Sequence, residues 1–297
     1  MKEDEILSKK RILTFFAFIS ILIMTVLFNG CRKTSSVDTN NIDTNKAQFK
    51  KENSNVRITE PRTFTKDPLI HNNKSIPVLM YHSIDYEEGN ELRVPKEQFK
   101  EQMKYLKDNG YTTLTLNELY NFLEKNKPIP EKSIVITLDD GYVDNYTNAY
   151  PILKELDINA TIFVVTSTID KDKNTLTSKQ IKEMDEYGID IASHTYNHDK
   201  LDDLAYEKQL ETMKKSKEDL EKILNHKVDF IAYPYGKWNE DTIKAAKDAG
   251  YKMAFTTDGT WSNKENGIYS LDRVYISSLR DMENFKERIT NPNYNKK

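Results

Sequence analysis

Short apolar or β-branched runs alternate with longer amphipathic segments through most of the chain. Runs of about four to eight such residues are typical of buried strands, whereas apolar residues three or four positions apart are typical of helices. The alternation therefore predicts strands joined by helices. The predicted strands are residues 76–81, 134–138, 161–165, 189–192, 228–232 and 253–256, and the predicted helices are segments around 99–106 and 119–123, then 145–156, 178–187, 204–224 and 239–249.

Strands that alternate with helices predict a parallel sheet covered by helices, which is an α/β fold. About seven strands in about 220 residues fit a closed or nearly closed (β/α) barrel. An open doubly wound sheet is the alternative, although the sequence has no G-x-G-x-x-G turn that would favour a nucleotide site. In both architectures ligands bind at the carboxyl ends of the strands, so residues that follow strands are the candidates for function.

The N-terminal segment has the pattern of a secretory signal. Lys9, Lys10 and Arg11 precede an uncharged apolar stretch, residues 12–28, and Cys31 follows shortly after it. We therefore predict a lipoprotein signal peptide over residues 1–30, lipidation of Cys31 and attachment to the outer face of a bacterial cell membrane. A retained transmembrane anchor is one alternative, because the apolar stretch is near the lower limit for crossing a bilayer, and secretion is another.

Residues 31–73 are polar, with Phe49 and Phe64 as their aromatic residues. Such a segment cannot bury enough apolar surface to offset its loss of conformational entropy, so we predict a disordered tether there and one folded domain over residues 74–297. Cys31 is the only cysteine, so no internal disulfide can form. The domain must therefore be stabilised by a packed core.

The charge balance limits the class of partner. The chain has 44 Lys and Arg residues against 47 Asp and Glu, a formal net charge of −3. Binding of nucleic acid requires clustered basic residues, so this balance argues against nucleic acid and favours a neutral or cationic substrate. No repeat period is visible, which argues against a repeat architecture. We also expect the protein to be a monomer.

Two short motifs carry the candidate chemistry: TLDDG at residues 137–141 ends one predicted strand, and HTYNH at residues 194–198 follows another. One carboxylate and two imidazoles are a sufficient ligand set for a divalent metal. Consecutive residues that leave a strand point in different directions, so one aspartate can bind the metal while its neighbour takes a proton from the attacking water. The pattern predicts a metal-dependent hydrolase, with Asp140, His194 and His198 as metal ligands and Asp139 as general base.

These motifs, together with AYPYG at residues 232–236, resemble the first three signatures of the polysaccharide deacetylases with a NodB homology domain, carbohydrate esterase family 4. The resemblance covers about residues 75–280, with the motifs in the family's order. It implies a distorted (β/α) barrel and hydrolysis of N-acetyl groups on amino-sugar polymers. It also implies one divalent metal ion held by Asp-His-His, with zinc expected and cobalt or nickel as alternatives.

The third motif implies part of the substrate groove. Pro234 and Tyr235 match a groove wall in which the Tyr235 backbone N–H helps to hold the oxyanion, and Tyr233 is a further candidate for this wall. For Tyr233 and Tyr235, ordinary packing is the alternative. The family usually has an Arg where this chain has Ala232, and Arg273 is our candidate to supply that guanidinium to the base, with a surface salt bridge as the alternative.

A second departure concerns the general acid. The family's common pattern places a histidine near the C-terminus, but no histidine follows His226 here. His82, at the end of the first predicted strand, can replace it, and this arrangement resembles the branch that deacetylates poly-β-1,6-N-acetylglucosamine of biofilms. We therefore expect His82 to protonate the leaving amine.

Three other functions stay open on the sequence. Deacetylation of N-acetylglucosamine in peptidoglycan would use the same residues on a β-1,4-linked backbone, and O-deacetylation of xylan is a more distant alternative. A surface lipoprotein that binds glycan with little turnover would keep the fold, and the absent Arg at Ala232 favours that reading. The intact set of aspartates and histidines argues against it.

Overall fold

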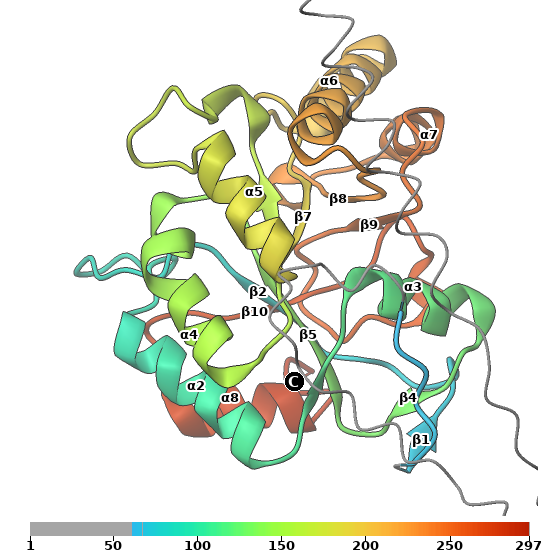
Figure 1. Cartoon of the computed structure of the whole chain (residues 1–297). Helices are drawn as coiled ribbons and strands as arrows, with labels where there is room; N and C mark the ends of the chain where they lie inside the picture. Colours follow the sequence, from blue (N-terminus) through green and yellow to red (C-terminus); the bar gives the residue numbers. More distant parts are fainter. Residues whose placement is uncertain (1–60, 67, 297) are drawn as a thin grey trace, which may run out of the picture. The chain divides into compact units, whose positions relative to one another are not determined.

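The computed structural model describes residues 61–66 and 68–296. Strands and helices alternate along most of this range (Figure 1). The strands are β1 (Leu69–Ile70), β2 (Val78–Tyr81), β3 (Thr112–Thr113), β4 (Ile129–Pro130), β5 (Ser133–Leu138), β6 (Thr161–Val164), β7 (Asp190–Ser193), β8 (Phe230–Ala232), β9 (Met253–Phe255) and β10 (Val274–Tyr275). The α-helices are α2 (Lys96–Asp108), α3 (Leu116–Lys125), α4 (Tyr150–Leu156), α5 (Ser178–Tyr187), α6 (Tyr206–Leu224), α7 (Glu240–Asp248) and α8 (Met282–Thr290). A π-helix, η1 (Asn145–Ala149), precedes α4, and short 3₁₀ turns are η2 (Thr166–Thr168), η3 (Leu201–Asp203), η4 (Pro234–Gly236) and η5 (Lys264–Asn266).

The main sheet is parallel and curls on itself. Its strand order is β10-β2-β5-β6-β7-β8-β9, with β3 beside β5. Phe255 in β9 forms a parallel bridge with Leu271, which lies just ahead of β10, so the segment that leads into β10 joins the two edges of the sheet. The predicted (β/α) barrel is confirmed in a distorted form, and the open doubly wound alternative is not what forms.

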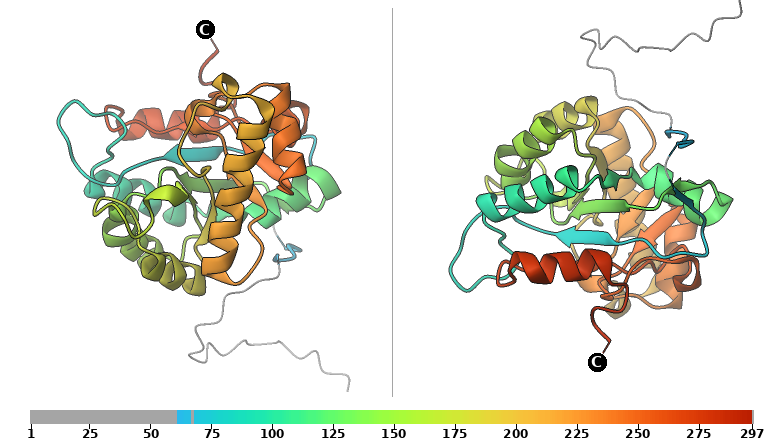
Figure 2. Two further views of the ribbon diagram at one scale, coloured as in Figure 1. Left: turned by 90° about the horizontal axis from the view of Figure 1, so that it is seen from above. Right: turned by 90° about the horizontal axis from the view of Figure 1, so that it is seen from below.

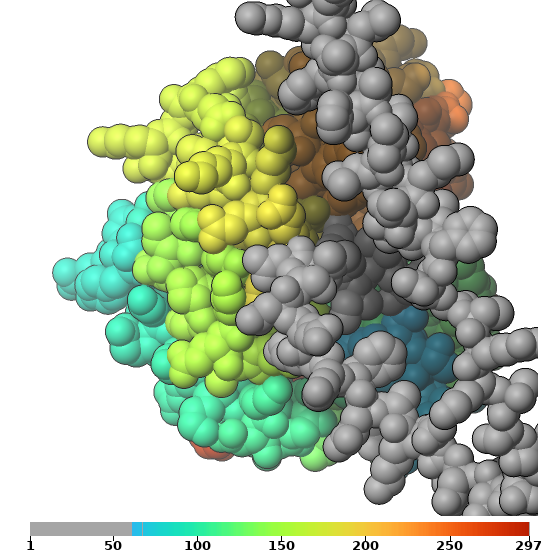
Figure 3. All heavy atoms as spheres, viewed as in Figure 1, coloured from blue at the N-terminus to red at the C-terminus, as the bar shows by residue number. Residues whose placement is uncertain are grey.

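Helices surround the sheet instead of covering one face (Figure 2). In the space-filling view, α2, α4 and α5 form one continuous outer surface (Figure 3). The core has two parts because successive strand residues point to opposite faces. The part under the helices includes Ile134, Ile136 and Leu138 of β5, whereas Val135 packs in a second cluster with Phe163 and residues of other strands.

That second cluster fills the barrel interior. Because alternate residues of each strand face this interior, the same alternation decides which side chains at the strand ends point into the site. Val135, Thr137 and Asp139 follow one another at intervals of two along β5, so Asp139 continues the inward-facing series at the carboxyl end. Ala192 leads in the same way to His194 beyond β7. The strand pattern therefore aims these two side chains at the mouth of the barrel.

Most predicted elements form within one or two residues of their expected ends, and α5 has the predicted bounds. The sequence prediction missed the two-residue strands β1, β3, β4 and β10, and it missed the helix α8. A two-residue strand has too little pattern to be seen, and α8 carries only two buried apolar positions, Phe285 and Ile289.

The C-terminal part of the predicted tether is a correction. Arg62 forms an ion pair with Glu118, with 2.7 Å between Nε and Oε1, and its Nη2 donates to the Thr113 carbonyl at 2.7 Å. β1 pairs with β4 in antiparallel register. Packed structure therefore begins before residue 74, because these side-chain and ladder bonds fix a polar segment that has little apolar surface of its own.

The signal peptide, Cys31 and residues 31–60 of the tether lie outside the described residues. Within the described ranges, the structure contains no helix with the length and apolar character needed to cross a membrane.

Candidate metal centre and active site

The candidate residues gather where β2, β5, β7 and β8 end. Asp140, Thr195, His198 and Tyr235 have positive φ angles of 73°, 65°, 63° and 57°, although none is glycine. Left-handed backbone costs such residues about 1–3 kcal/mol each and persists only where the surroundings enforce it. Several other positive-φ residues simply end helices, where this conformation is ordinary. Strain without a capping role is therefore concentrated in the loops that carry the three motifs.

Asp140, His194 and His198 bring three ligand atoms together, all within 4.8 Å of one another. Asp140 Oδ1 lies 3.3 Å from His194 Nε2 and 3.1 Å from His198 Nε2. The αL turn at Asp140 separates its side chain from that of Asp139, as the sequence reading required of two neighbouring aspartates. The structure thus brings the three predicted ligands to one point.

Hydrogen bonds fix the orientation of these ligands. His194 Nδ1 lies 2.8 Å from the Ala232 carbonyl, which can only accept, so Nδ1 carries the proton and Nε2 of the neutral ring has a free lone pair. The backbone N–H of His198 donates to Thr195 Oγ1 at 3.1 Å, and this bond stabilises the strained turn. The position of Ala232 thus has a backbone role that its side chain does not reveal.

The donor set fits a cation. Asp140 Oδ1 is buried and makes no hydrogen bond within the described part of the chain. It faces the lone pair of the buried His194, an arrangement of two acceptors that is repulsive unless a cation lies between them. Burial raises the pKa of Asp140, but hydrogen bonds and positive charge from His194 and His198, when their rings are protonated, outweigh this and lower it well below its usual range.

Asp139 is paired with Arg273 inside the barrel. Both guanidinium nitrogens Nη1 and Nη2 donate to the carboxylate at 2.7 Å, and Arg273 is fully buried. Arg273 also donates from Nε to the Thr256 carbonyl at 2.8 Å and from Nη1 to Thr137 Oγ1 at 3.1 Å. The alternative of a surface salt bridge is therefore excluded for Arg273. Burial raises the pKa of Asp139, but the charge and hydrogen bonds of Arg273 lower it below its ordinary value.

His82 follows β2 at the same rim. Its Nδ1 is buried and has no hydrogen-bond partner among the residues the structure describes, and its ring packs edge-on against Tyr275 with 6.3 Å between centroids. Burial lowers the pKa of His82, while the charges of Asp139 and Asp140 raise it in part. The imidazole therefore shares the electrostatic environment of both aspartates.

The third motif divides between surface and core. Tyr235 is 53% exposed, and its ring lies against His198 with 4.6 Å between centroids. Gly236 is required beside it, because a Cβ there would overlap Thr257 and φ is positive. Tyr233 is a correction to the sequence reading: it is fully buried in the core under the helices, one residue out of step with inward-facing Ala232, and cannot contact substrate. Pro234 is buried in the turn between them.

Several residues near the site escaped the sequence reading. Burial and the nearby Asp140 charge raise the pKa of Tyr142 to about 12. Asp144 and Asn145 bond to the loop that begins at His82. The motif TLDDG drew attention to its own aspartates, and nothing in the spacing of the following residues marked them as partners of a distant loop.

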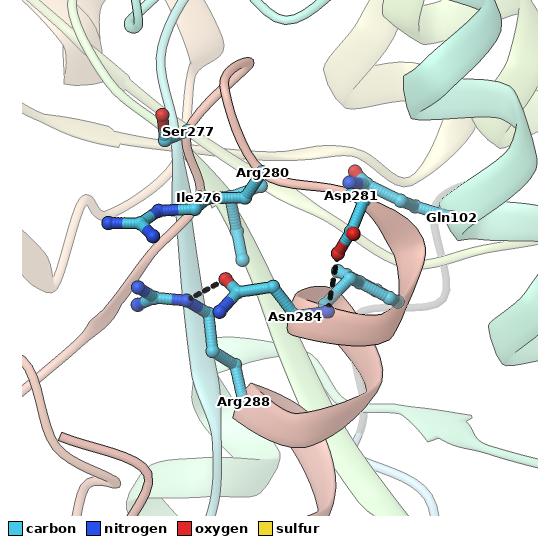
Figure 4. Close-up of a pocket in the computed structure, with 8 residues that line it drawn as sticks. Gln102, Ile276, Ser277, Arg280, Asp281, Asn284 and Arg288 are labelled. Carbon is cyan, nitrogen blue, oxygen red and sulfur yellow. Dashed lines mark hydrogen bonds between the residues drawn. The ribbon is translucent and has the colours of Figure 1, made fainter.

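A separate hollow contains none of the predicted site residues (Figure 4). Asp281 caps α8 by accepting from the Asn284 N–H at 2.9 Å, and Arg288 bonds both the Asn284 side chain at 2.7 Å and the Tyr275 carbonyl at 3.1 Å. These contacts join α8 to β10, so the hollow is a structural joint. It is lined by Gln102, Ile276, Ser277, Arg280, Asp281, Asn284, Phe285 and Arg288.

Known proteins are similar to this chain in sequence and in fold. A profile of the family described as polysaccharide deacetylase matches residues 125–254. YxkH of Bacillus subtilis (strain 168), whose assigned name places it among the polysaccharide deacetylases, is 45% identical over 202 residues, which cover 68% of this chain and 71% of YxkH. The poly-β-1,6-N-acetyl-D-glucosamine N-deacetylase of Staphylococcus epidermidis is 32% identical over 274 residues, which cover 88% of this chain and 92% of that protein.

A solved structure agrees with these relatives. The Streptococcus pyogenes deacetylase PplD, in complex with acetate, matches with a TM-score of 0.70 and 35% identity over 73% of this chain and 98% of PplD. The resemblance to the NodB-type barrel drawn from three motifs is thus confirmed across most of the described domain. The chain belongs to the polysaccharide deacetylase family, carbohydrate esterase family 4, and is a hydrolase of amide carbon–nitrogen bonds.

Proposed function

We propose that this protein is a metal-dependent N-deacetylase of N-acetylglucosamine polymers at the bacterial cell surface, with poly-β-1,6-N-acetylglucosamine as its substrate. The choice of polymer is supported by the Staphylococcus epidermidis relative, whose name states that activity and which aligns over 92% of its length. The observation that carries the chemistry is the convergence of Asp140, His194 and His198 beside the buried Asp139–Arg273 pair. This supports hydrolysis over mere glycan binding.

Asp140, His194 and His198 would hold the metal, and we expect zinc because a mixed nitrogen and oxygen ligand set with an open position suits it. When bound there, a divalent cation would polarise the acetyl carbonyl and acidify water. The Ala232 carbonyl would keep the His194 tautomer that presents Nε2.

Asp139 is the general base of the proposal. Its lowered pKa keeps it ionised near neutral pH, so it can accept a proton from the attacking water. Arg273 fixes both carboxylate oxygens, which leaves the remaining lone pairs aimed at the barrel mouth. Arg273 thereby supplies the guanidinium that the motif lacks at Ala232.

His82 is the general acid. Burial lowers its pKa, which makes the protonated ring a stronger acid, while the nearby carboxylates help it to hold a proton until it is needed. The negative charge of the tetrahedral intermediate would favour the protonated ring further. Transfer of that proton to the nitrogen then breaks the C–N bond and releases acetate and a free amine.

Pro234 and Tyr235 form the groove wall in this account. The strained turn at Tyr235, with φ 57°, places the residue against His198, so its backbone N–H is available near the acetyl oxygen. The exposed ring offers an apolar face on which a sugar can stack.

Location is a proposal from the N-terminal sequence. Residues 1–30 would direct export, and lipid on Cys31 would anchor a monomeric enzyme to the outer face of the membrane. Labelling with a palmitate analogue would test this: the intact chain should carry the label and Cys31→Ser should not.

Acetate release from β-1,6-linked and β-1,4-linked N-acetylglucosamine oligomers tests the function. We expect release that favours the β-1,6 series, stops with a chelator and returns with zinc. His198→Ala should abolish it, whereas His226→Ala, a histidine that contacts Asp185 instead of the site, should keep it. Preference for the β-1,4 series would support peptidoglycan as the substrate, and glycan binding without acetate release from either series would overturn the enzyme proposal.

A further inference from the structure

Two buried side chains hold the loop that carries His82. Asn145 Nδ2 donates to the His82 carbonyl at 2.9 Å and to Asp144 Oδ1 at 3.2 Å. Asp144 accepts from the Ser83 hydroxyl at 2.7 Å and from the Ile84 N–H at 2.7 Å. Three consecutive residues of one loop are thus bonded to two consecutive residues of another, and we call Asp144 and Asn145 the clamp.

The clamp joins the two halves of the active site. Asp144 and Asn145 follow Asp139 and Asp140 on the loop after β5, whereas His82 follows β2, the neighbouring strand. The pairing continues past the strand ends, because the Asp139 N–H donates to the Tyr81 carbonyl at 2.9 Å. A shift in the clamp would therefore move the acid relative to the base and the metal ligands.

The clamp is shielded from water and set in an unusual helix. Asn145 is 0% exposed, Ser83 1% and Asp144 7%, so water cannot readily replace these bonds. Asn145 begins the π-helix η1, a conformation that is rare and often found at functional sites. The extra residue in this turn lets a side chain be aimed where an α-helix would not place it.

His82 depends on backbone support more than Asp139 does, because the Asp139 side chain is held by Arg273. Its Nδ1 has no hydrogen-bond partner among the described residues, so no side-chain bond at that atom orients the ring. What fixes the ring is the backbone on which it sits and its edge contact with Tyr275. The backbone bonds of the clamp are therefore the main polar restraint on the position of the imidazole.

We propose that Asp144 and Asn145 are positioning residues for proton donation by His82, which they hold at the distance from Asp139 and Asp140 that the reaction needs. The proposal rests on the proposed role of His82 as general acid. A displacement of about 1 Å in a catalytic group can lower a rate by about 100-fold, so loss of the clamp should reduce turnover without altering the groove.

Amide and ester substrates separate this role from a general loss of structure. The amine leaving group of an N-acetyl sugar needs a proton, whereas the aryl oxide of an aryl acetate leaves without one. We expect Asn145→Ala to lower kcat on N-acetylglucosamine oligomers by about tenfold or more with KM unchanged. Hydrolysis of the aryl acetate should stay within about twofold of wild type, which also reports an intact metal site.

Asn148→Ala is the matched control. Asn148 Nδ2 donates to the Ile84 carbonyl at 2.8 Å, so this variant loses a similar bond to the same loop, two residues beyond His82. Its kcat on both substrates should stay close to wild type. If Asn145→Ala does not fold, Ser83→Ala removes one bond of the clamp and carries the same test, with an expected loss of about threefold on the amide alone.

A double-mutant cycle completes the experiment. In the His82→Ala background, Asn145→Ala should cause no further loss on the amide, because the group that it positions is gone. Additive losses, equal losses on amide and ester, or equal effects of Asn145→Ala and Asn148→Ala would each overturn the clamp. If His82→Ala itself keeps full amide turnover, the proposed acid role fails instead, and the two failures are thereby distinguished.

Discussion

The base and the acid of the proposed site are held in opposite ways. Asp139 is fixed through its side chain, by two 2.7 Å bonds from a fully buried Arg273. His82 is fixed through its backbone, while its Nδ1 has no partner within the described structure. When one partner of a buried side-chain ion pair is lost, the other charge is left unpaired at a large cost in free energy. Loss of one of several hydrogen bonds to a backbone costs less. Loss of the group that supports the base should therefore lower activity more than loss of a group that supports the acid.

The largest effect should come from Arg273→Met. Removing one partner of a buried ion pair leaves an unpaired charge, which costs about 3–5 kcal/mol of the free energy of unfolding. Deacetylation should fall by at least about 100-fold, because Asp139 loses both its orientation and its depressed pKa. Denaturant titration and acetate release measure the two losses. The double variant Asp139→Asn/Arg273→Met removes both members of the pair, so it should regain stability but not activity. A single variant Arg273→Met that is stable and active would contradict the comparison.

Tyr233→Ala and Tyr235→Ala sharpen the division between core and groove. Tyr233 is fully buried, so its truncation should cost about 3–5 kcal/mol of unfolding free energy. Tyr235 is 53% exposed, so its truncation should leave stability within about 0.5 kcal/mol and raise KM for the oligomer several-fold. A KM change in a folded Tyr233 variant, such as Tyr233→Phe, would contradict the assignment of Tyr233 to the core.

The pH dependence of stability tests the state of Asp139. Its folded pKa lies below the ordinary value of about 3.9, so its ionised form contributes stability above that pH, and this contribution is lost as pH falls below it. The metal-free protein should therefore lose stability below about pH 4 more steeply than Asp139→Asn. Denaturation midpoints in the presence of chelator measure the two slopes, and parallel slopes would show that Asp139 does not titrate as a paired carboxylate.

The smallest effect should be at the N-terminal end of the described structure. The Arg62–Glu118 pair has a half-exposed guanidinium but a buried carboxylate, with side-chain exposures of 42% and 2%. Arg62→Ala should cost about 1 kcal/mol of unfolding free energy, because Glu118 keeps its second role in capping α3. Deacetylation should not change. A loss of activity in this variant would mean that the segment contributes to the site.

The sequence was informative where one rule applied to many residues. Parallel strands bring their carboxyl ends to one rim, which was enough to place Asp139, Asp140, His194 and His198 together. The prediction for Tyr233 was wrong because neighbouring strand residues face opposite sides of the sheet. Tyr233 follows the inward-facing Ala232 and therefore faces the core under the helices.

Long-range polar contacts left no pattern to read. The clamp consists of side chains bonded to a backbone about sixty residues away, and backbone acceptors exist at every position. The C-terminal part of the predicted tether was wrong for a related reason, because the Arg62–Glu118 pair and the short β1–β4 ladder order a segment whose composition suggested disorder. Arg273 could be predicted only through the family resemblance, because Ala232 occupies the position where the third motif usually has an arginine.

The most direct test of the account compares Asp139→Asn and His82→Ala on an N-acetylglucosamine oligomer and on an aryl acetate. Both variants should lose amide hydrolysis by about 100-fold or more. Only Asp139→Asn should also lose ester hydrolysis, because both substrates need an activated water and only the amide needs a protonated leaving group. Equal losses on both substrates for His82→Ala, or full ester activity in Asp139→Asn, would contradict the division of roles between base and acid.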